Sequence, residues 1–353
     1  MTKTSISWCI SPDGSPGFTW SPVVGCRAVS PGCQNCWAAR LASTRLAHLP
    51  EYKGLAKDGK WTGGPRFLSD RLSQPLHKRK PAGIFVSDMG DLFHAAVGDQ
   101  LIAAVFGVMA ACPQHRFFLL TKRAQRMRKW FAWMKLEART CNAGRGAPEA
   151  FVAVAYAQRE GLSAVDVDGI TSRAWPLPNV WIGTSIEDQA TADERIPELL
   201  QTPAAVRWVS AEPLLGPVNL CSAAMPKWRE SAPELSWLVC GGEAGPLSRP
   251  CRVEWIRSIV EQCKAAHVPV FVKQFWANCQ TRNDDNFTGD MNDPDFPLWP
   301  DTPGGVSVVD RIEELPGGGY QGALVRVRLH DRAGADPAEW PADLRVRQFP
   351  VSA

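Results

Sequence analysis

The sequence predicts an α/β fold in which strands and helices alternate around a parallel sheet. Six short and almost wholly apolar runs follow residue 80, and such near-continuous hydrophobicity is typical of strands covered on both faces. Most neighbouring runs begin roughly 26 to 33 residues apart, which is the length of one strand–helix unit. The six predicted strands are 84–86, 117–120, 180–182, 206–209, 237–239 and 270–272.

Two segments between these runs have helical character. Residues 100–111 form an almost wholly apolar segment, and residues 254–266 place their apolar side chains on one helical face. The first strand of the series is less well defined than the others. Both 5–8 and 20–24 are candidates for it, and a turn-rich loop separates them.

Two parts of the chain break the strand–helix pattern. The runs that begin at 117 and 180 lie about twice as far apart as the others, so we expect an insertion at about 140–176 that could act as a lid. After residue 279 a polar segment rich in Pro, Gly and Asp precedes a predicted β-hairpin and a tail. We therefore predict a main domain over 1–279 and a small C-terminal appendage over 280–353.

Composition narrows the classes of function. The 353 residues carry a net charge of +3, which is too small to indicate nucleic-acid binding by electrostatics alone. No apolar run approaches the ~20 residues that span a bilayer, so we expect no membrane partner. The N-terminus has no apolar signal segment, so the expected compartment is the cytoplasm. In a reducing cytoplasm, clustered cysteines among the 11 are better explained as ligands or catalysts than as disulfides.

Polar residues follow each predicted strand directly. In a (β/α) barrel the carboxyl ends of the strands meet at one mouth, and that mouth carries the chemistry. The alternative is that such loops are polar in any case and that Ser, Thr or Asp caps the next helix. The pair Gly241 and Gly242 indicates a tight turn or a close approach of the backbone to a ligand. The charged residues of the predicted mouth are Asp88, Lys122, Arg123, Glu187, Glu212, Glu243 and Lys273.

Three cysteines with the spacing C-x6-C-x2-C precede this series of strands. Cys26, Cys33 and Cys36 lie on one loop that leads into a helical stretch, and three thiolates in so short a loop form a soft-ligand site. An iron–sulfur cluster held by three cysteines leaves one iron open to a substrate or cofactor. The alternatives are a zinc site, with Cys9 or His48 as the fourth ligand, and unligated cysteines.

Several segments of the chain together resemble a known family. They are SISW, GCRAVSPGCQNCWA, IFVSDMGDLFH, FFLLTKRAQRM, NVWIGTSIEDQ, RIPELL, VRWVSAEPLLGPV, CGGEAGP and VPVFVKQFW, in this order over about residues 3–278. The family is a phage-associated, uncharacterised radical-SAM-like family of three-cysteine-motif proteins, often found near a three-cysteine-motif partner protein. The C-terminal tail is only loosely similar to it.

The resemblance implies a partial (β/α) barrel of the radical-SAM type. It places a [4Fe–4S] cluster on Cys26, Cys33 and Cys36, with S-adenosylmethionine (SAM) on the open iron and an external electron donor. Reduction of SAM would then yield a 5′-deoxyadenosyl radical that abstracts hydrogen from a substrate. The sequence departs from the commonest pattern of such enzymes in three ways. The first cysteine spacing is x6 rather than x3, and an aromatic residue follows the third cysteine instead of preceding it. Residues 87–91 also replace the early Gly-Gly-Glu that often holds the SAM amino group.

The same resemblance suggests which residues bind SAM. Ser87 or Asp88 would receive the amino group, and Lys122 or Arg123 would pair with the carboxylate. Ser185 or Glu187 would reach the ribose hydroxyls. The other expected cofactor-binding residues are Glu212, Gly241, Gly242 and Glu243.

Radical-SAM chemistry on an unknown substrate is therefore the leading functional hypothesis. Nucleic acid is the first substrate to consider, because the basic segments 78–80 and 122–129 could contact phosphates, and Trp130 and Trp133 could stack on bases. The purely structural interpretation is that these charged side chains lie on solvated helix faces and that the tryptophans are core residues. The alternative function is a zinc-stabilised nucleic-acid or protein binding module without turnover. A third is a structural partner subunit that has lost catalysis.

Overall fold

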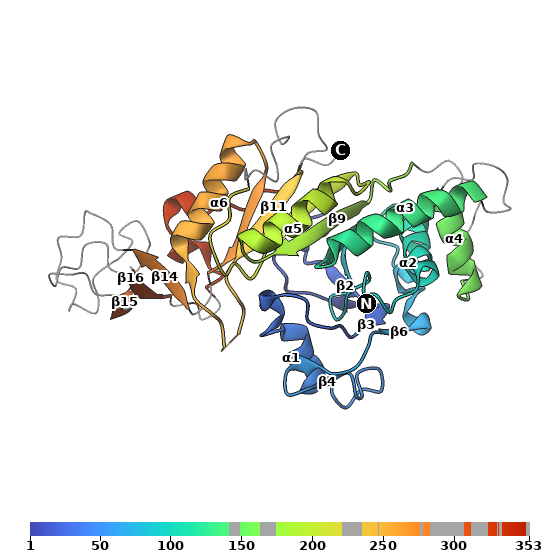
Figure 1. Ribbon diagram of the computed structural model, residues 1–353, viewed down its shortest axis with the longest axis horizontal. Coiled ribbons are helices and arrows are strands. Elements are labelled where there is room, and N and C mark those ends of the chain that lie inside the picture. The colour runs from blue at the N-terminus through green and yellow to red at the C-terminus, as the bar shows by residue number, and fades with distance from the viewer. Residues whose placement is uncertain are drawn as a thin grey trace.

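The computed structural model describes ten segments of the chain. They are 1–140, 149–162, 174–220, 235–245, 247–275, 278–282, 307–311, 324–329, 331 and 334–350. An eight-stranded sheet in the order β1-β2-β7-β8-β9-β10-β11-β13 forms the centre of the molecule (Figure 1). All neighbouring strands are parallel except β1 and β2. The predicted α/β class with a largely parallel sheet is confirmed, and no closed barrel forms among the described strands.

The strands of the large sheet follow the chain in order. Each of the six apolar runs after residue 80 lies in a strand, because buried β-branched and aromatic residues are well suited to a sheet covered on both faces. The first strand differs from both candidates, since β2 ends where the second candidate begins and 5–8 is not a strand. The strands are β1 (Thr2–Lys3), β2 (Phe18–Trp20), β7 (Gly83–Val86), β8 (Arg116–Thr121), β9 (Val180–Ile186), β10 (Val206–Ala211), β11 (Trp237–Gly241) and β13 (Val270–Gln274).

Helices pack on one face of this sheet. The alternation of side chains along β8 separates the two faces, because Phe117 and Leu119 join the core shared with the helices, whereas Phe118 points to the other face. Both predicted helices are confirmed, as α2 and α6. None of the described helices is long and apolar enough to cross a membrane. The helices are α1 (Trp37–Ser43), α2 (Asp99–Ala111), α3 (Ala124–Thr140), α4 (Glu149–Arg159), α5 (Gln189–Leu200) and α6 (Val253–Ala265).

An aromatic cluster covers the opposite face of the sheet. It includes one ring from each of six parallel strands, and no described helix contributes to it. Trp8 from the N-terminal segment packs among these rings, with ring centroids 5.0 Å from Phe85 and 5.0 Å from Trp208. Gly183 permits this packing, because a Cβ there would lie 2.6 Å from the Trp208 indole. The strand rings are Phe85, Phe118, Trp181, Trp208, Trp237 and Phe271.

The described part of the predicted insertion is α4, and it belongs to the helical layer. It packs against α2, where Gly107 is required because a Cβ at that position would come within 2.3 Å of the Ala153 carbonyl oxygen. Figure 1 places α4 beyond α2, far from α1. This helix is therefore a core element and not a lid over the strand ends. Residues 141–148 and 163–173 of the predicted insertion lie outside the described residues.

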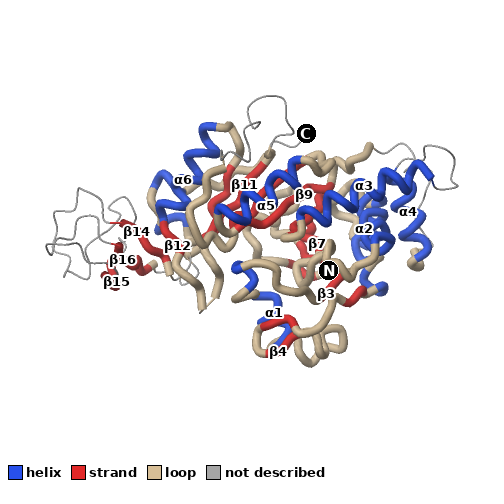
Figure 2. Tube along the Cα trace, viewed as in Figure 1, coloured by secondary structure: helices blue, strands red, loops and turns tan. Residues whose placement is uncertain are grey.

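A second, smaller sheet lies at the other end of the molecule (Figure 2). Its strands are β12 (Cys251–Arg252), β14 (Cys279–Arg282), β15 (Ser307–Arg311) and β16 (Leu324–Arg328), in the order β12-β14-β16-β15. The strands β15 and β16 are antiparallel, as expected for the predicted hairpin. The polar segment before it, at 283–306, lies outside the described residues.

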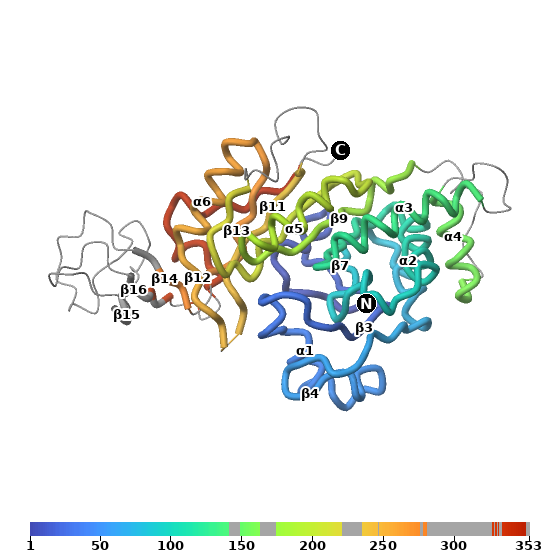
Figure 3. Tube along the Cα trace, in the orientation of Figure 1, coloured from blue at the N-terminus to red at the C-terminus, as the bar shows by residue number. Residues whose placement is uncertain are grey.

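The C-terminal tail returns to the large sheet, beside β13 and α6 (Figure 3). Its backbone bonds to the free edge of β13, with Val272 N donating to the Val346 carbonyl at 2.8 Å and Gln348 N donating to the Val270 carbonyl at 2.9 Å. Trp340 is fully buried and contacts Phe275 at 5.2 Å between ring centroids. The division at residue 280 stays a prediction about domains, but in its packing the tail belongs to the main body.

We expect Trp340→Ala to lower the free energy of unfolding by about 3–5 kcal/mol, because it removes a buried indole and leaves a cavity. Trp37→Ala is the matched control, since Trp37 is 42% exposed and its loss should change stability by no more than about 0.5 kcal/mol. Urea denaturation of the whole chain measures both changes. Equal effects of the two substitutions would show that the tail is not anchored as described.

Candidate functional site

The cysteine loop lies across the carboxyl ends of the large sheet. Residues 26–36 include the short 3-10 helix Pro31–Cys33, and Cys36 is the N-cap of α1. Two small two-stranded sheets support this region. They are β3 (Val23–Val24) with β6 (Arg66–Phe67), and β4 (Ala56–Lys57) with β5 (Lys60–Trp61). Side chains from the ends of three strands of the large sheet contact the loop directly.

The first of these contacts is Glu187, which follows β9. Its carboxylate is completely buried and accepts hydrogen bonds from Ser30 Oγ at 2.9 Å and from Arg195 at 3.2 and 3.3 Å. It also forms an ion pair with Lys122. Gly32 is fitted against the same side chain, because a Cβ there would lie 2.4 Å from Glu187 Cγ. Glu187 therefore fixes the middle of the cysteine loop.

The second contact is Glu243, which follows β11. Asn35, which lies between the second and third cysteines, donates to Glu243 at 3.0 Å and to the Leu247 carbonyl at 2.8 Å. Arg249 holds both carboxylate oxygens of Glu243 at 2.8 and 2.5 Å and also donates to the Pro31 carbonyl at 2.9 Å. Burial raises the pKa of Glu243, but these hydrogen bonds outweigh it and hold the pKa below its ordinary value.

The third contact is Arg123, which follows β8. Its guanidinium donates to the Arg27 carbonyl at 2.8 Å, to Asp91 at 2.6 Å and, over a longer 3.5 Å, to Cys26 Sγ. Asp91 also accepts a hydrogen bond from Thr121 at 2.8 Å. The start of the cysteine loop is thereby attached to the ends of β7 and β8.

The three thiols differ in their surroundings. Burial, together with the charge of Asp91, raises the pKa of Cys26 to about 11. Burial also raises the pKa of Cys33, but the charge of Lys122 and hydrogen bonds from the backbone of Val29 and Ser30 outweigh it and lower the pKa below its usual value. All three cysteines are half-buried and unpaired by disulfides. Their chemistry suits a soft metal or an iron–sulfur cluster.

Across the described segments, no three or more His, Cys, Asp or Glu side chains are grouped so that they could hold a single metal ion. A [4Fe–4S] cluster differs from such a site, because each of its cysteines binds a different iron. Cys9, the first alternative fourth ligand for zinc, is buried with the aromatic cluster, where its thiol faces the Phe18 carbonyl at 3.7 Å.

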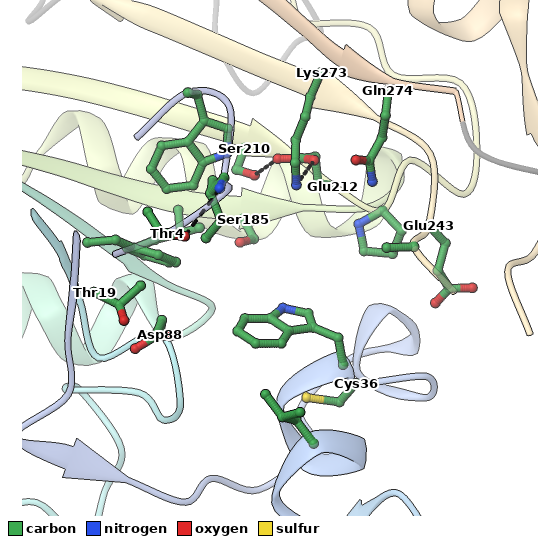
Figure 4. Close-up of a pocket in the computed structure, with 18 of the residues that line it drawn as sticks. Thr4, Thr19, Cys36, Asp88, Ser185, Ser210, Glu212, Glu243, Lys273 and Gln274 are labelled. Carbon is green, nitrogen blue, oxygen red and sulfur yellow. Dashed lines mark hydrogen bonds and ion pairs between the residues drawn. The ribbon is translucent and has the colours of Figure 1, made fainter. Parts of the chain in front are cut away.

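A pocket of about 670 Å³ separates the cysteine loop from the strand ends. This volume is within the usual range for small-molecule sites, about 300–1,000 Å³. Figure 4 shows Cys36 on one side of the pocket and Ser185, Ser210, Glu212 and Lys273 on the other. Glu212 and Lys273 form an ion pair at 2.8 Å.

Asp88 forms part of another wall, next to Thr19 (Figure 4). Burial raises the pKa of Asp88, and hydrogen bonds from Ser21 and Thr19 only partly offset this effect. A buried carboxyl whose ionised form is costly would be stabilised by a cationic group of a ligand. Ser87 is different, because it is buried with a positive φ of 57° and does not line the pocket.

The structure divides the predicted site residues into two groups. Cys33, Cys36, Asp88, Lys122, Ser185, Glu212, Gly242 and Glu243 line the pocket. The other group consists of Cys26, Ser87, Arg123, Glu187 and Gly241, which do not line it. Arg123 and Glu187 hold the cysteine loop instead. Gly241 and Gly242 are explained by packing, because a Cβ would lie 2.9 Å from the Gln274 carbonyl or 2.5 Å from the Phe275 carbonyl.

The basic helix predicted to contact phosphates is largely neutralised. Arg126 on α3 pairs with Asp99 at 2.6 Å, and Arg128 on the same helix pairs with Glu198. Trp130 is fully buried and stacks on Phe106 with centroids 4.5 Å apart. The charges of this helix and Trp130 are therefore better explained by the fold than by phosphate or base contacts. Nucleic-acid binding has to be argued from other residues.

Several residues of the site carried no readable sequence signal. Asn35 could have been noticed because it lies inside the cysteine motif, but its partner Glu243 is more than 200 residues away. Arg249 and Asp91 are ordinary charged residues in loops. Lys3 and Arg45 also line the pocket, and they do so from the N-terminal strand and from the segment after α1.

We expect Glu187→Gln to lower the free energy of unfolding by about 3 kcal/mol or more, because it leaves the charges of Lys122 and Arg195 close together without their buried counter-ion. Limited proteolysis should also cut the cysteine loop faster. Glu194→Gln is the control, because Glu194 faces the same Arg195 at 3.9 Å but is 72% exposed. If both variants behave alike, Glu187 does not anchor the loop.

A pH dependence follows from Glu243. Its pKa is lower in the folded chain than in the unfolded one, so its contribution to stability is complete above the ordinary glutamate pKa of about 4.3 and is lost as the pH falls through the folded value. Protease sensitivity of the cysteine loop should therefore rise as the pH falls below about 4.3. Glu243→Gln should flatten this dependence, whereas Glu261→Gln on the exposed side of α6 should leave it intact. An unchanged profile in Glu243→Gln would contradict the assignment.

Comparison with known proteins gives a family but no activity. Residues 3–330 match the model of the family DUF5131, which is described as a protein of unknown function. No curated protein and no solved structure matches the chain. Phage association and radical-SAM character, both implied by the resemblance of the sequence segments, are not part of this match. Since the matched region spans most of the 353 residues, the chain belongs to the DUF5131 family.

Proposed function

We propose that the protein is a radical-SAM-type enzyme that holds a [4Fe–4S] cluster on Cys26, Cys33 and Cys36. The observation that carries the proposal is the position of the three-cysteine loop. It is fixed by strand-end side chains at the carboxyl edge of a parallel sheet, beside a pocket of about 670 Å³. In α/β folds this edge is where ligands bind and chemistry takes place.

Three thiolates suit an iron–sulfur cluster that keeps one iron open. When bound, the cluster and SAM would supply one-electron transfer and hydrogen abstraction, which side chains cannot provide. The chain contributes binding and orientation. Glu187, Glu243 and Arg123 hold the loop, so that the cysteines stay at the edge of the pocket.

The pocket also supports the assignment of SAM contacts to some of the predicted residues. Asp88 is suited to an ammonium group, because a neighbouring cation would offset the cost of ionising a buried carboxyl. Lys122, Ser185, Gly242 and Glu243 also line the space available to a cofactor, whereas Glu212 lies across the pocket from Cys36. Ser87, Arg123, Glu187 and Gly241 do not line the pocket, and their assignment as SAM contacts depends on the resemblance alone.

The finer features of the proposal follow from the resemblance. The open, largely parallel sheet is compatible with the partial (β/α) barrel of radical-SAM enzymes, and an external electron donor is required to start the reaction. A three-cysteine-motif partner protein is a further proposed partner. The zinc-binding module is the weaker candidate, because Cys9 is buried away from solvent and His48, the other alternative ligand, is exposed on the segment that follows α1.

Anaerobic reconstitution tests this function. We expect about four iron and four sulfide ions per chain, and production of 5′-deoxyadenosine after addition of SAM and dithionite. Cys26→Ala, Cys33→Ala and Cys36→Ala should each lose most of the bound iron, because each removes one of three ligands. Cys112→Ala, at the C-terminal end of α2, is the control and should retain it.

Two outcomes would contradict the proposal. Zinc without iron in the reconstituted wild-type protein would favour the binding module. Iron retained equally by the loop variants and by Cys112→Ala would show that these cysteines are not the ligands. Counts of iron, sulfide and zinc per chain distinguish these cases.

A further inference from the structure

We propose that the substrate side of this pocket receives a nucleotide, with its base against aromatic side chains and its phosphate at a cationic rim. The inference rests on the proposed function and deepens it by naming the class of substrate. It does not use the basic helix α3, whose arginines are paired. It depends on three features of the pocket.

The first feature is aromatic surface. Trp8 and Phe85 line the pocket from the aromatic cluster. Trp37 lines it from the start of α1 and is 42% exposed, which is unusual for so large an apolar side chain. A ring that stays exposed at the edge of a pocket can stack on the face of a base, and every base has such a face.

The second feature is a set of hydrogen-bonding groups on the opposite wall. Glu212 and Lys273 lie side by side, and Ser210 donates to Glu212 at 3.1 Å (Figure 4). Their ion pair leaves further acceptor sites on the carboxylate and further protons on the ammonium group. On its Watson–Crick edge every base carries a donor beside an acceptor, which such a pair can match.

The third feature is the charge of the rim. Lys3 and Arg45 line the pocket and are exposed, and in the segments that the structure describes neither makes an ion pair or a side-chain hydrogen bond. The pocket residues contributed by the segment 14–50 include no Asp or Glu, and the carboxylates that line the pocket, Asp88, Glu212 and Glu243, come from the loops after β7, β10 and β11. The other cations of the pocket, Lys122 and Lys273, are paired with glutamates. The rim is thus suited to an anionic group such as a phosphate.

A polypeptide is the competing occupant. Val29 and Leu247 are exposed on the cysteine loop and on the loop after β11, and such side chains also occur where proteins dock. Unpaired cations next to an exposed indole, together with a donor–acceptor pair at the base of the pocket, favour a nucleotide. The nucleotide could be free or part of a single strand, because both present the same base and phosphate.

Binding to the reconstituted protein tests the proposal. Calorimetry would use GMP and UMP, and fluorescence anisotropy would use a labelled ten-nucleotide single strand, all without reductant and in the presence of saturating SAM. We expect the protein to bind at least one of these probes. Trp37→Ala and the double change Lys3→Gln with Arg45→Gln should each weaken binding about tenfold or more, and the double change should also reduce the salt dependence. Lys135→Gln, an exposed cation on α3, is the matched control and should have no effect.

The two sources of nucleotide are distinguished by their affinities. A strand that binds at least about a hundredfold more tightly than GMP or UMP would identify nucleic acid as the substrate, and similar affinities would identify free nucleotides. The proposal is overturned if no probe binds, if Trp37→Ala and the double change bind as the wild type does, or if a polyglutamate peptide displaces the strand as effectively as unlabelled strand. It is also overturned if binding occurs only when SAM is omitted, because the nucleotide would then be occupying the SAM site.

Failure of this inference can be separated from failure of the proposed function. Formation of 5′-deoxyadenosine without nucleotide binding would overturn the substrate class alone. Nucleotide binding by a protein that retains zinc and no iron would overturn the radical-SAM function alone.

Discussion

The buried carboxylate of Glu187 is the constraint on which the candidate site depends. It accepts hydrogen bonds or ion pairs from Lys122 after β8, from Arg195 on α5 and from Ser30 in the cysteine loop. A completely buried carboxylate is tolerated only when such partners satisfy it. The helical layer, the sheet edge and the cysteine loop therefore meet at one charge, and a shift of any one of the three removes a partner from that charge.

In this arrangement, different residues at the strand ends hold the cysteine loop and line the pocket. Glu187 and Arg123 are occupied with the loop, while Asp88, Ser185 and Glu212 face the pocket. Rigid attachment of a ligand loop matters for metal chemistry, because the residues around the ligands set their orientation. The cysteines lie beside the pocket because their loop is attached to the strand ends of the sheet.

The strands were predictable because continuous apolar runs require cover on both faces, and the site was predictable as a region because parallel strands end at one edge. The roles of the individual residues at the strand ends were not predictable, because they depend on the direction in which each side chain points after its strand ends. Glu187 and Glu212 each follow a strand that ends in Ser and one apolar residue, yet Glu187 contacts the cysteine loop and Glu212 lines the pocket. Trp130 resembled a surface residue beside basic neighbours, but it packs on Phe106. Trp340 and Gly241 likewise owe their roles to contacts between distant segments.

The aromatic cluster on one face of the sheet contributes both to the core of the protein and to the wall of the pocket. Trp8 fills the space among rings from six strands and also lines the pocket, while Phe349 from the tail packs on Trp237 and Phe271. Both chain ends thus complete the face that the helices leave uncovered. Because the same indole belongs to the core and to the pocket wall, its position is set by the packing of the whole cluster. A ligand that packs against Trp8 therefore meets a ring whose orientation has already been fixed by folding, so little ordering of this wall remains to oppose binding.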